Sequence, residues 1–219
     1  QTWTQIERRI RRGGLTEKQK KELWASLFLD EDQISELLKY VKKNAAHPFI
    51  YPMFVFTAYA GTRRSEVLRS DIEDFDFDTN QILIRERKRR KDMQQTFRFV
   101  PLHPKLKRVM DAWFDEHPGG PYTIAAPLKM ARRPERTEFD QMGPNVAHHH
   151  FKRTLKDSKW AVIRGFHVLR HSFGSNLARS GKVSRDTIGE WMGHSTEEMK
   201  TLYQHLFPQD GQTQISVLK

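Results

Sequence analysis

The sequence predicts a mostly α-helical, α+β domain: a helical bundle with a small antiparallel β-sheet. Apolar residues recur at helical spacing over most of the chain. Near the middle, the period changes to that of strands, since Ile82 and Ile84 alternate with polar neighbours, as do Phe97 and Phe99. The order is therefore helices, one hairpin and helices again, which favours one mostly helical domain carrying a small sheet.

The first 26 residues are expected to form an extension ahead of the main domain. The basic stretch "RRIRRGG" ends in a glycine pair, which predicts a flexible joint. The following "LTEKQKKELWASLF" predicts a short helix with leucine and tryptophan on one face. This helix is either simply solvated or part of a linker that lies along DNA phosphates.

Two helices are predicted to open the main domain. Asp30 can cap the first, and Gln33 three residues later completes a capping box. Its apolar stripe consists of Ile34, Leu37, Leu38 and Val41. The second, "HPFIYPMFVFTAYAG", is apolar on nearly every side, which predicts a buried helix that ends at Gly61.

The predicted hairpin is preceded by an acidic run and followed by further helices. The run "DIEDFDFDTN" lacks the glycine and closing glutamate of a calcium loop, so a solvated turn is expected. Helices are then expected in "HPKLKRVMDAWFDEHPGG", from Pro144 to about Lys156, and at about 167–180, 184–192 and 196–206. A short extended stretch is expected at "KWAVIRGF", and residues 207–219 form a C-terminal tail.

Composition limits the classes of function. The net charge of +11 and the pI near 9.9 favour a polyanionic partner, most often nucleic acid. The chain has no cysteine, which excludes disulfides, thiolate zinc sites and cysteine nucleophiles. No apolar run approaches the roughly 18 residues of a membrane span. We therefore expect an intracellular, cytoplasmic protein.

Arginine and histidine are concentrated at two places. Arg63 and Arg64 directly follow the predicted buried helix and Gly61, a position suited to bidentate phosphate binding. Glu66 either supports such an arginine or forms a surface salt bridge. His167 and Arg170 share a helix face that His171 borders.

Histidine spacing alone could also suggest zinc, but the neighbouring residues argue against it. His167 and His171 are four residues apart, yet Arg170 would oppose a dication and the glutamate of a metalloprotease motif is missing. Residues 148–150, "HHH", point in different directions on a helix and cannot converge on one metal. These three are expected to be solvated or to face phosphates.

Together these motifs resemble the catalytic domain of the tyrosine recombinase (phage integrase) family. "GTRRSE", "HVLRH" and "GHS", with Tyr203 nine residues after His194, match in order and spacing over about residues 28–206. The resemblance implies two catalytic arginines, two histidines, a hairpin lysine and a tyrosine nucleophile. These fall on Arg63, Arg170, His167, His194, Lys88 and Tyr203, with Lys91 as the alternative lysine.

The resemblance also implies a reaction. Tyr203 would cleave DNA through a 3′-phosphotyrosyl intermediate, with no metal or nucleotide cofactor, and rejoining would recombine or integrate DNA. The arginines and His194 would neutralise the phosphate, His167 would act as base or proton relay, and Lys88 would protonate the leaving oxygen. Further contacts to double-stranded DNA are expected from Arg64, Arg87, Arg89, Arg90, Lys91 and His171.

The family further implies an organisation of the whole protein. Residues 1–26 would be the linker from a missing N-terminal core-binding domain, and residues 27–206 the catalytic domain. The tail 207–219 would dock on a neighbouring subunit in a DNA-bound homotetramer. A bacterial-type, nucleoid-associated enzyme of a mobile element is expected.

Three other functions compete with this interpretation. A type IB topoisomerase uses a similar set of residues to relax DNA, and a non-catalytic relative would only bind it. A zinc hydrolase built on the histidines would be sensitive to chelators.

Overall fold

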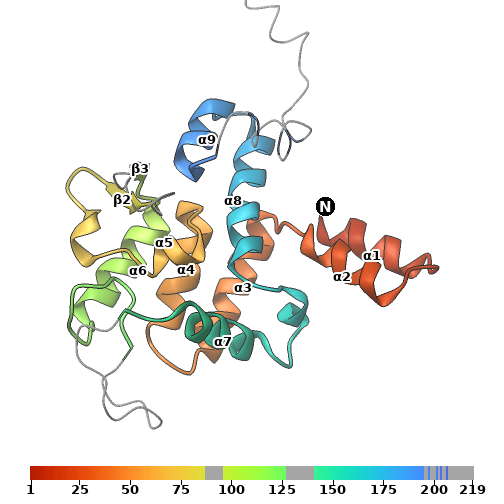
Figure 1. Cartoon of the computed structure of the whole chain (residues 1–219), viewed down its shortest axis with the longest axis horizontal. Coiled ribbons are helices and arrows are strands. Elements are labelled where there is room, and N and C mark those ends of the chain that lie inside the picture. Colours follow the sequence, from red (N-terminus) through yellow and green to blue (C-terminus); the bar gives the residue numbers. More distant parts are fainter. Residues whose placement is uncertain are drawn as a thin grey trace, which may run out of the picture.

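The computed structural model describes residues 1–86, 96–126 and 141–194, and the single positions 197, 201, 203 and 206. Figure 1 shows helices arranged around α4 and a small sheet at one side of them. The described elements are α1 (Trp3–Arg11), α2 (Glu17–Ala25), α3 (Glu31–Asn44), α4 (Ile50–Ala60), α5 (Arg64–Val67), η1 (Ile72–Asp74), β1 (Phe75–Asp76), β2 (Gln81–Arg85), β3 (Phe97–Pro101), α6 (Pro104–Asp115), α7 (Pro144–Leu155), η2 (Lys159–Val162), α8 (Phe166–Ser180) and α9 (Arg185–Met192). The predicted mostly helical fold with a small antiparallel sheet is confirmed.

Helix α4 is the centre of the core, as its apolar sequence predicts. It packs against α3, α6 and α8, and Phe54 stacks on Phe151 of α7 with ring centroids 4.4 Å apart. The helix ends at Gly61, whose left-handed φ of 60° suits glycine. A Cβ there would lie 2.5 Å from the Phe173 ring. Gly61 thus lets α8 approach the end of α4 closely.

The capping box predicted for α3 is present. Asp30 accepts a hydrogen bond from the Gln33 backbone, and the Gln33 side chain accepts one from the Asp30 backbone. The predicted stripe from Ile34 to Val41 is buried. Helices α6, α7, α8 and α9 also begin and end close to their predicted bounds.

The hairpin is confirmed and belongs to a three-stranded antiparallel sheet in the order β1-β2-β3. Ile84 pairs with Arg98, and Ile82 pairs with Val100. Phe97 and Phe99, whose alternation predicted the strand, are 51% and 60% exposed, whereas Arg98 is 6% exposed. The inward face of β3 is therefore the one that carries an arginine.

The prediction of a solvated turn for the acidic run is wrong in part. The run forms η1 and β1, and Asp74 is buried. Asp74 binds Arg85 through both carboxylate oxygens, at 2.8 and 2.9 Å from Nε. This ion pair ties the run to β2 and explains why a carboxylate is tolerated inside.

The first 26 residues form two helices that pack on the domain. The glycine pair lies between them, with φ near 75° at Gly13 and 74° at Gly14. Ile6 is fully buried, and the Trp3 ring contacts Trp24 at 5.0 Å and Trp160 at 5.6 Å between centroids. Figure 1 shows α1 and α2 on the side of the bundle away from the sheet.

The structure bears differently on two expectations, one for the stretch before α8 and one for the end of the chain. The stretch expected to be extended contains the 3₁₀ helix η2, which Ser158 caps through the Trp160 backbone. The predicted helix at 196–206 lies mostly outside the described residues, as does the tail. Among the helices that the structure describes, none is long and apolar enough to cross a membrane.

Candidate active site

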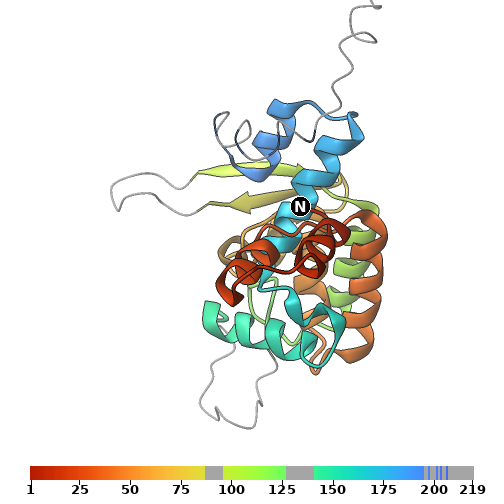
Figure 2. The ribbon, with the colours of Figure 1, turned by 90° about the vertical axis from the view of Figure 1, so that its right-hand side faces the viewer.

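The candidate site lies where the end of α4 meets α5, α8, α9 and the hairpin. Figures 1 and 2 both place α9, in blue, beside the hairpin strands. The chain here brings together residues that are more than a hundred positions apart, since Arg63 binds Gly193 and Arg170 binds Gly61. The described motifs around Arg63, Arg170 and Gly193 therefore meet in space.

Arg63 is held in place but stays accessible. Its Nη1 donates to Glu66 Oε1 at 2.8 Å, and its Nη2 donates to the Gly193 carbonyl at 3.0 Å. The side chain keeps 41% of its surface exposed. A fixed, exposed guanidinium of this kind is suited to binding a phosphate oxygen.

Arg170 is buried and bound by backbone carbonyls. Its Nη1 donates to the Gly61 carbonyl and its Nη2 to the Met192 carbonyl, both at 2.5 Å. Burial first, and then the charge of Arg63, lower the pKa of Arg170 to about 10, against the opposing effect of Glu66. The guanidinium therefore remains charged at neutral pH and joins α4, α8 and α9.

Glu66 supports the arginines from beneath, which decides between the two roles expected for it. It is 2% exposed, and its carboxylate also binds Arg98 Nη2 at 2.7 Å and lies 3.9 Å from Arg170 Nη1. Burial by itself raises the pKa of Glu66, but the hydrogen bonds and charge of Arg98, aided by Arg63, outweigh it and lower the pKa to about 2. Glu66 is thus a buried anion shared by three arginines.

Tyr203 lies inside the protein beside this cluster. It is 1% exposed, its hydroxyl is 3.2 Å from His171 Nδ1, and its ring stacks on His194 at 6.1 Å between centroids. Burial raises the pKa of Tyr203 to about 12, and the charge of Arg170 opposes that rise. The phenol is therefore neutral and shielded from solvent in this arrangement.

The two histidines of α8 stack on each other. The His167 and His171 rings are 6.1 Å apart and nearly parallel. Surrounding protein, and then the charge of Arg170, lower the pKa of His167 below its usual 6.5, although the residue keeps exposed surface. His167 is thus favoured in its neutral form, as a base requires. His171, expected to contact DNA, lies between Phe28 and Tyr203.

Several other predicted residues are not brought to the site by the described structure. Lys88 and Lys91, and with them Arg87, Arg89 and Arg90, lie outside the described residues. Arg64 is partly buried at the start of α5. Of the three consecutive histidines, His150 is buried against His47 and Phe49, contrary to the expectation of solvated side chains.

Metal ligands do not gather anywhere in the described ranges. No group of three or more histidine, aspartate or glutamate side chains there could hold an ion. At the candidate site, guanidinium groups occupy the space beside the carboxylates of Glu66 and Glu86. Arginine side chains therefore supply positive charge at the described site.

Arg98 is a member of the described cluster that the motifs did not indicate. It donates to Glu66, to Glu86 Oε1 at 2.9 Å and to the Trp191 carbonyl at 2.7 Å. Its strand position, two residues before Val100, places both side chains on one face of β3, but the sequence pattern does not say that this face turns inward.

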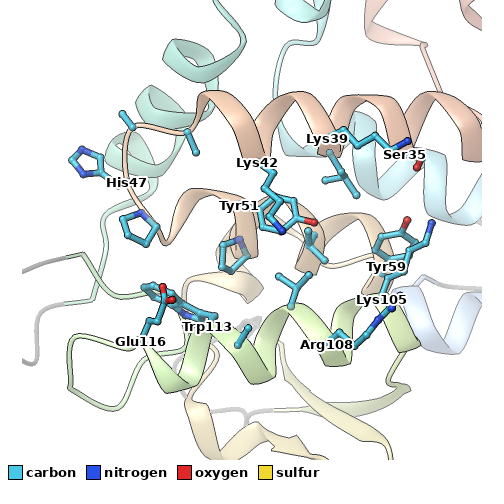
Figure 3. Close-up of a pocket in the computed structure, with 18 residues that line it drawn as sticks. Ser35, Lys39, Lys42, His47, Tyr51, Tyr59, Lys105, Arg108, Trp113 and Glu116 are labelled. Carbon is cyan, nitrogen blue, oxygen red and sulfur yellow. The ribbon is translucent and has the colours of Figure 1, made fainter.

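A groove of about 790 Å³ lies elsewhere, between α3, α4 and α6 (Figure 3). Apolar side chains such as Val55 line it together with four basic residues, Lys39, Lys42, Lys105 and Arg108. Lys42 lies over the Tyr51 ring and Lys105 over the Tyr59 ring, each 5.7 Å from the centroid. None of the catalytic candidates that the structure describes lines this groove.

The chain is similar in sequence to known proteins. The model of the phage integrase family matches residues 27–210. An integrase/recombinase of Escherichia coli is 28% identical over 178 residues, which covers 69% of this chain and 52% of that protein. The chain thus spans about half the length of this curated relative.

Solved structures show the same fold. The Tn1549 transposon integrase in complex with circular intermediate DNA has a TM-score of 0.65 and 17% identity, covering 89% of this chain and 65% of that one. The catalytic domain of bacteriophage HP1 integrase has a TM-score of 0.57 and 21% identity, covering 87% of this chain and 94% of that one. With the family model matching most of its residues, the chain belongs to the phage integrase family.

Proposed function

We propose that the protein is a tyrosine site-specific recombinase that cleaves and rejoins double-stranded DNA. The observation that carries this proposal is the cluster of Arg63 and Arg170 over buried Glu66. Tyr203 lies beside this cluster, in contact with His171 and His194. Membership of the phage integrase family and the resemblance to an integrase bound to DNA support it.

The cluster can do without a metal what divalent cations do in other phosphoryl-transfer sites. When a phenol attacks a phosphodiester, negative charge grows on the non-bridging oxygens. Arg63 would neutralise part of this charge with its accessible fork, and Arg170 would do so from the buried side. His194 would donate a further hydrogen bond. No metal or nucleotide is required in this scheme.

Proton transfer would fall to the other members. His167, favoured in its neutral form, would take the phenolic proton directly or through His171, whose Nδ1 already contacts the Tyr203 hydroxyl. Lys88, with Lys91 as the alternative, would give a proton to the leaving 5′ oxygen. The product is a 3′-phosphotyrosyl bond and a free 5′ hydroxyl, and attack by another 5′ hydroxyl rejoins the strands.

Tyr203 cannot reach a DNA phosphate from its buried position. With 1% exposure and a raised pKa, Tyr203 would be a nucleophile that is shielded and neutral until it moves. Cleavage therefore requires Tyr203 to leave His171 and approach Arg63. There the charges of Arg63 and Arg170 would stabilise the phenolate and would offset its repulsion from the phosphate.

The remaining parts of the proposal concern the whole protein. Residues 1–26 would connect to a core-binding domain, and the exposed arginines of α1 would follow the DNA backbone. Further DNA contacts would come from Arg64, Arg87, Arg89, Arg90, Lys91 and His171. The tail 207–219 would join subunits in a DNA-bound homotetramer, in a nucleoid-associated cytoplasmic setting.

Covalent capture tests the proposal. The protein is mixed with nicked duplexes from the DNA that flanks its gene, in EDTA, and run on a denaturing gel beside Tyr203→Phe. We expect a DNA-linked band for the wild type alone, with the adduct mapped to Tyr203. An adduct that requires a divalent metal would contradict the arginine mechanism.

A second measurement separates the competing functions. Salt-sensitive DNA binding by the full-length protein without any adduct would indicate a non-catalytic relative. Relaxation of supercoiled DNA without strand exchange would indicate a type IB topoisomerase. Exchange between two labelled duplexes is the result that a recombinase predicts.

A further inference from the structure

Arg98 occupies an unusual place for an arginine on a β-strand. It lies on β3, and its side chain is 5% exposed. An isolated buried charge is costly, so its partners must compensate it. Its partners are Glu66, Glu86 and the Trp191 carbonyl, which belong to segments that border catalytic candidates.

The first partner is Glu66, which also binds the Arg63 guanidinium. Arg98 Nη2 binds Glu66 Oε2 at 2.7 Å, and Nη1 lies 3.2 Å from Oε1. Because Oε1 also binds Arg63, Arg98 neutralises a carboxylate that would otherwise draw Arg63 inward. This leaves Arg63 with charge to offer to a phosphate.

The second partner is Glu86, at the base of the hairpin loop. Arg98 Nη1 binds Glu86 Oε1 at 2.9 Å, while Thr96 donates to Glu86 Oε2 at 2.6 Å. Glu86 and Thr96 flank residues 87–95, the segment that contains Lys88. Arg98 therefore fixes both ends of that segment to the site.

The third partner is the end of α9. Arg98 Nε donates to the Trp191 carbonyl at 2.7 Å, just before the turn that carries Gly193 and His194. A Cβ at Gly193 would lie 2.3 Å from Glu86 Oε1 and 3.0 Å from Arg98 Nη1. The turn thus packs directly on the Arg98–Glu86 pair.

We propose that Arg98 is a positioning residue that holds Arg63, the base of the Lys88 hairpin and the His194 turn in one arrangement for the scissile phosphate. It acts through Glu66, Glu86 and the Trp191 carbonyl and does not touch DNA. This role rests on the proposed recombinase function. Its planar fork makes these contacts in different directions at once, which a lysine cannot do.

The same sheet supplies a matched control. Arg85, on β2, also binds a buried carboxylate, that of Asp74, and its Nη2 is 2.7 Å from Asp74 Oδ1. The Arg85 pair joins β2 to η1, and its ion pairs and hydrogen bonds in the described part of the chain involve none of the catalytic candidates. Arg85→Lys therefore weakens an ion pair of similar chemistry away from the site.

The test compares Arg98→Lys with Arg85→Lys in three measurements: urea unfolding, DNA affinity and the single-turnover rate of adduct formation at saturating nicked DNA. We expect both variants to lose some stability and to keep their DNA affinity within about twofold. Arg98→Lys should form the adduct about 100-fold more slowly, the scale of a reacting group displaced by about 1 Å. Arg85→Lys should stay near the wild-type rate.

Double variants sharpen the assignment. Glu86→Gln should slow adduct formation, and combining it with Arg98→Lys should add little, because both changes release the same contact. If the double variant slowed adduct formation by the product of the two single-variant factors, the shared positioning role would be contradicted. So would a wild-type rate in Arg98→Lys, or equal slowing in Arg85→Lys.

A measurement that needs no activity separates this inference from the proposed function. Titration of the His194 imidazole by NMR should show shifted resonances in Arg98→Lys and unchanged ones in Arg85→Lys, because only the former releases the turn. A wild type that forms no adduct would defeat the recombinase proposal. Unshifted His194 resonances in Arg98→Lys would defeat the positioning role whether or not DNA is cleaved.

Discussion

Helix α4 separates two regions that are both rich in positive charge but treat it differently. At its C-terminal end, Arg98 and Arg170 are buried and bound by carboxylates and carbonyls. Along its flank, Lys42 and Lys105 lie over tyrosine rings at the edge of an open groove. The first region fixes the direction of each guanidinium, and the second leaves ammonium groups on flexible stems.

The difference teaches that charge alone does not mark the reactive region of this molecule. A net charge of +11 predicts a polyanionic partner but does not say which cations hold a phosphate in a defined geometry. Burial and hydrogen bonding indicate which cations are held in a defined geometry, because a buried arginine with compensating partners has few alternative positions. Substitutions at the site should therefore cost much more stability than substitutions in the groove.

Removing the buried anion should have the largest effect. Glu66→Gln leaves Arg98 and Arg170 without their shared carboxylate, and loss of one partner of a buried pair costs about 3–5 kcal/mol. Urea unfolding measures the change. Glu36→Gln, in the exposed pair with Lys159, is the control and should cost about 1 kcal/mol or less. Equal losses in the two variants would contradict the comparison.

Acid should reproduce part of this loss in the wild type. The pKa of Glu66 is about 2 in the folded protein and near 4.5 when unperturbed, so its contribution is complete above about pH 4.5. It is lost as pH falls towards 2, and over that range it amounts to about 3 kcal/mol. The stability difference between wild type and Glu66→Gln, measured by urea unfolding, should therefore shrink with falling pH. A constant difference would contradict the lowered pKa.

The sequence predicts much of the fold because the relevant signals are local. The capping box at Asp30, the apolar run of α4 and the glycine at position 61 each act within a few residues. Strand alternation on β3 is also local, but it defines two faces without saying which one turns inward. Only packing against α9 and Glu66 shows that Arg98 is the buried one.

The site residues stay a prediction from the family resemblance of the motifs. Of these residues, the structure brings Arg63 and Arg170 to Glu66, and it places Tyr203 beside His194. The burial of the Tyr203 hydroxyl was not predictable, since it depends on α8 and on the partner that the hydroxyl finds there.

That burial can be disturbed from α8. A Cβ at Gly174 would lie 2.5 Å from Met192 Sδ and 2.9 Å from Tyr203 Cζ. Gly174→Ala should displace both side chains at an overpacking cost of about 1–3 kcal/mol, reduced by the better helix propensity of alanine. We expect unfolding by urea at lower concentration and faster nitration of Tyr203 by tetranitromethane, with Tyr51 and Tyr59 as internal references. Unchanged nitration of Tyr203 would show that Met192 alone absorbs the added methyl group.

The smallest effect is expected in the groove. Lys105→Ala removes an exposed cation that lies over the partly buried Tyr59 ring, an interaction of about 0.5–1 kcal/mol, and surface substitutions generally stay near that size. The unfolding free energy should change by no more than about 1 kcal/mol, and adduct formation should be unaltered, because the groove shares no side chain with the cluster around Glu66. A loss as large as that of Glu66→Gln would mean that Lys105 is fixed by packing as the buried arginines are. The contrast between the C-terminal end of α4 and its flank would then fail, because ammonium groups over aromatic rings would be as rigidly held as guanidinium groups on carboxylates.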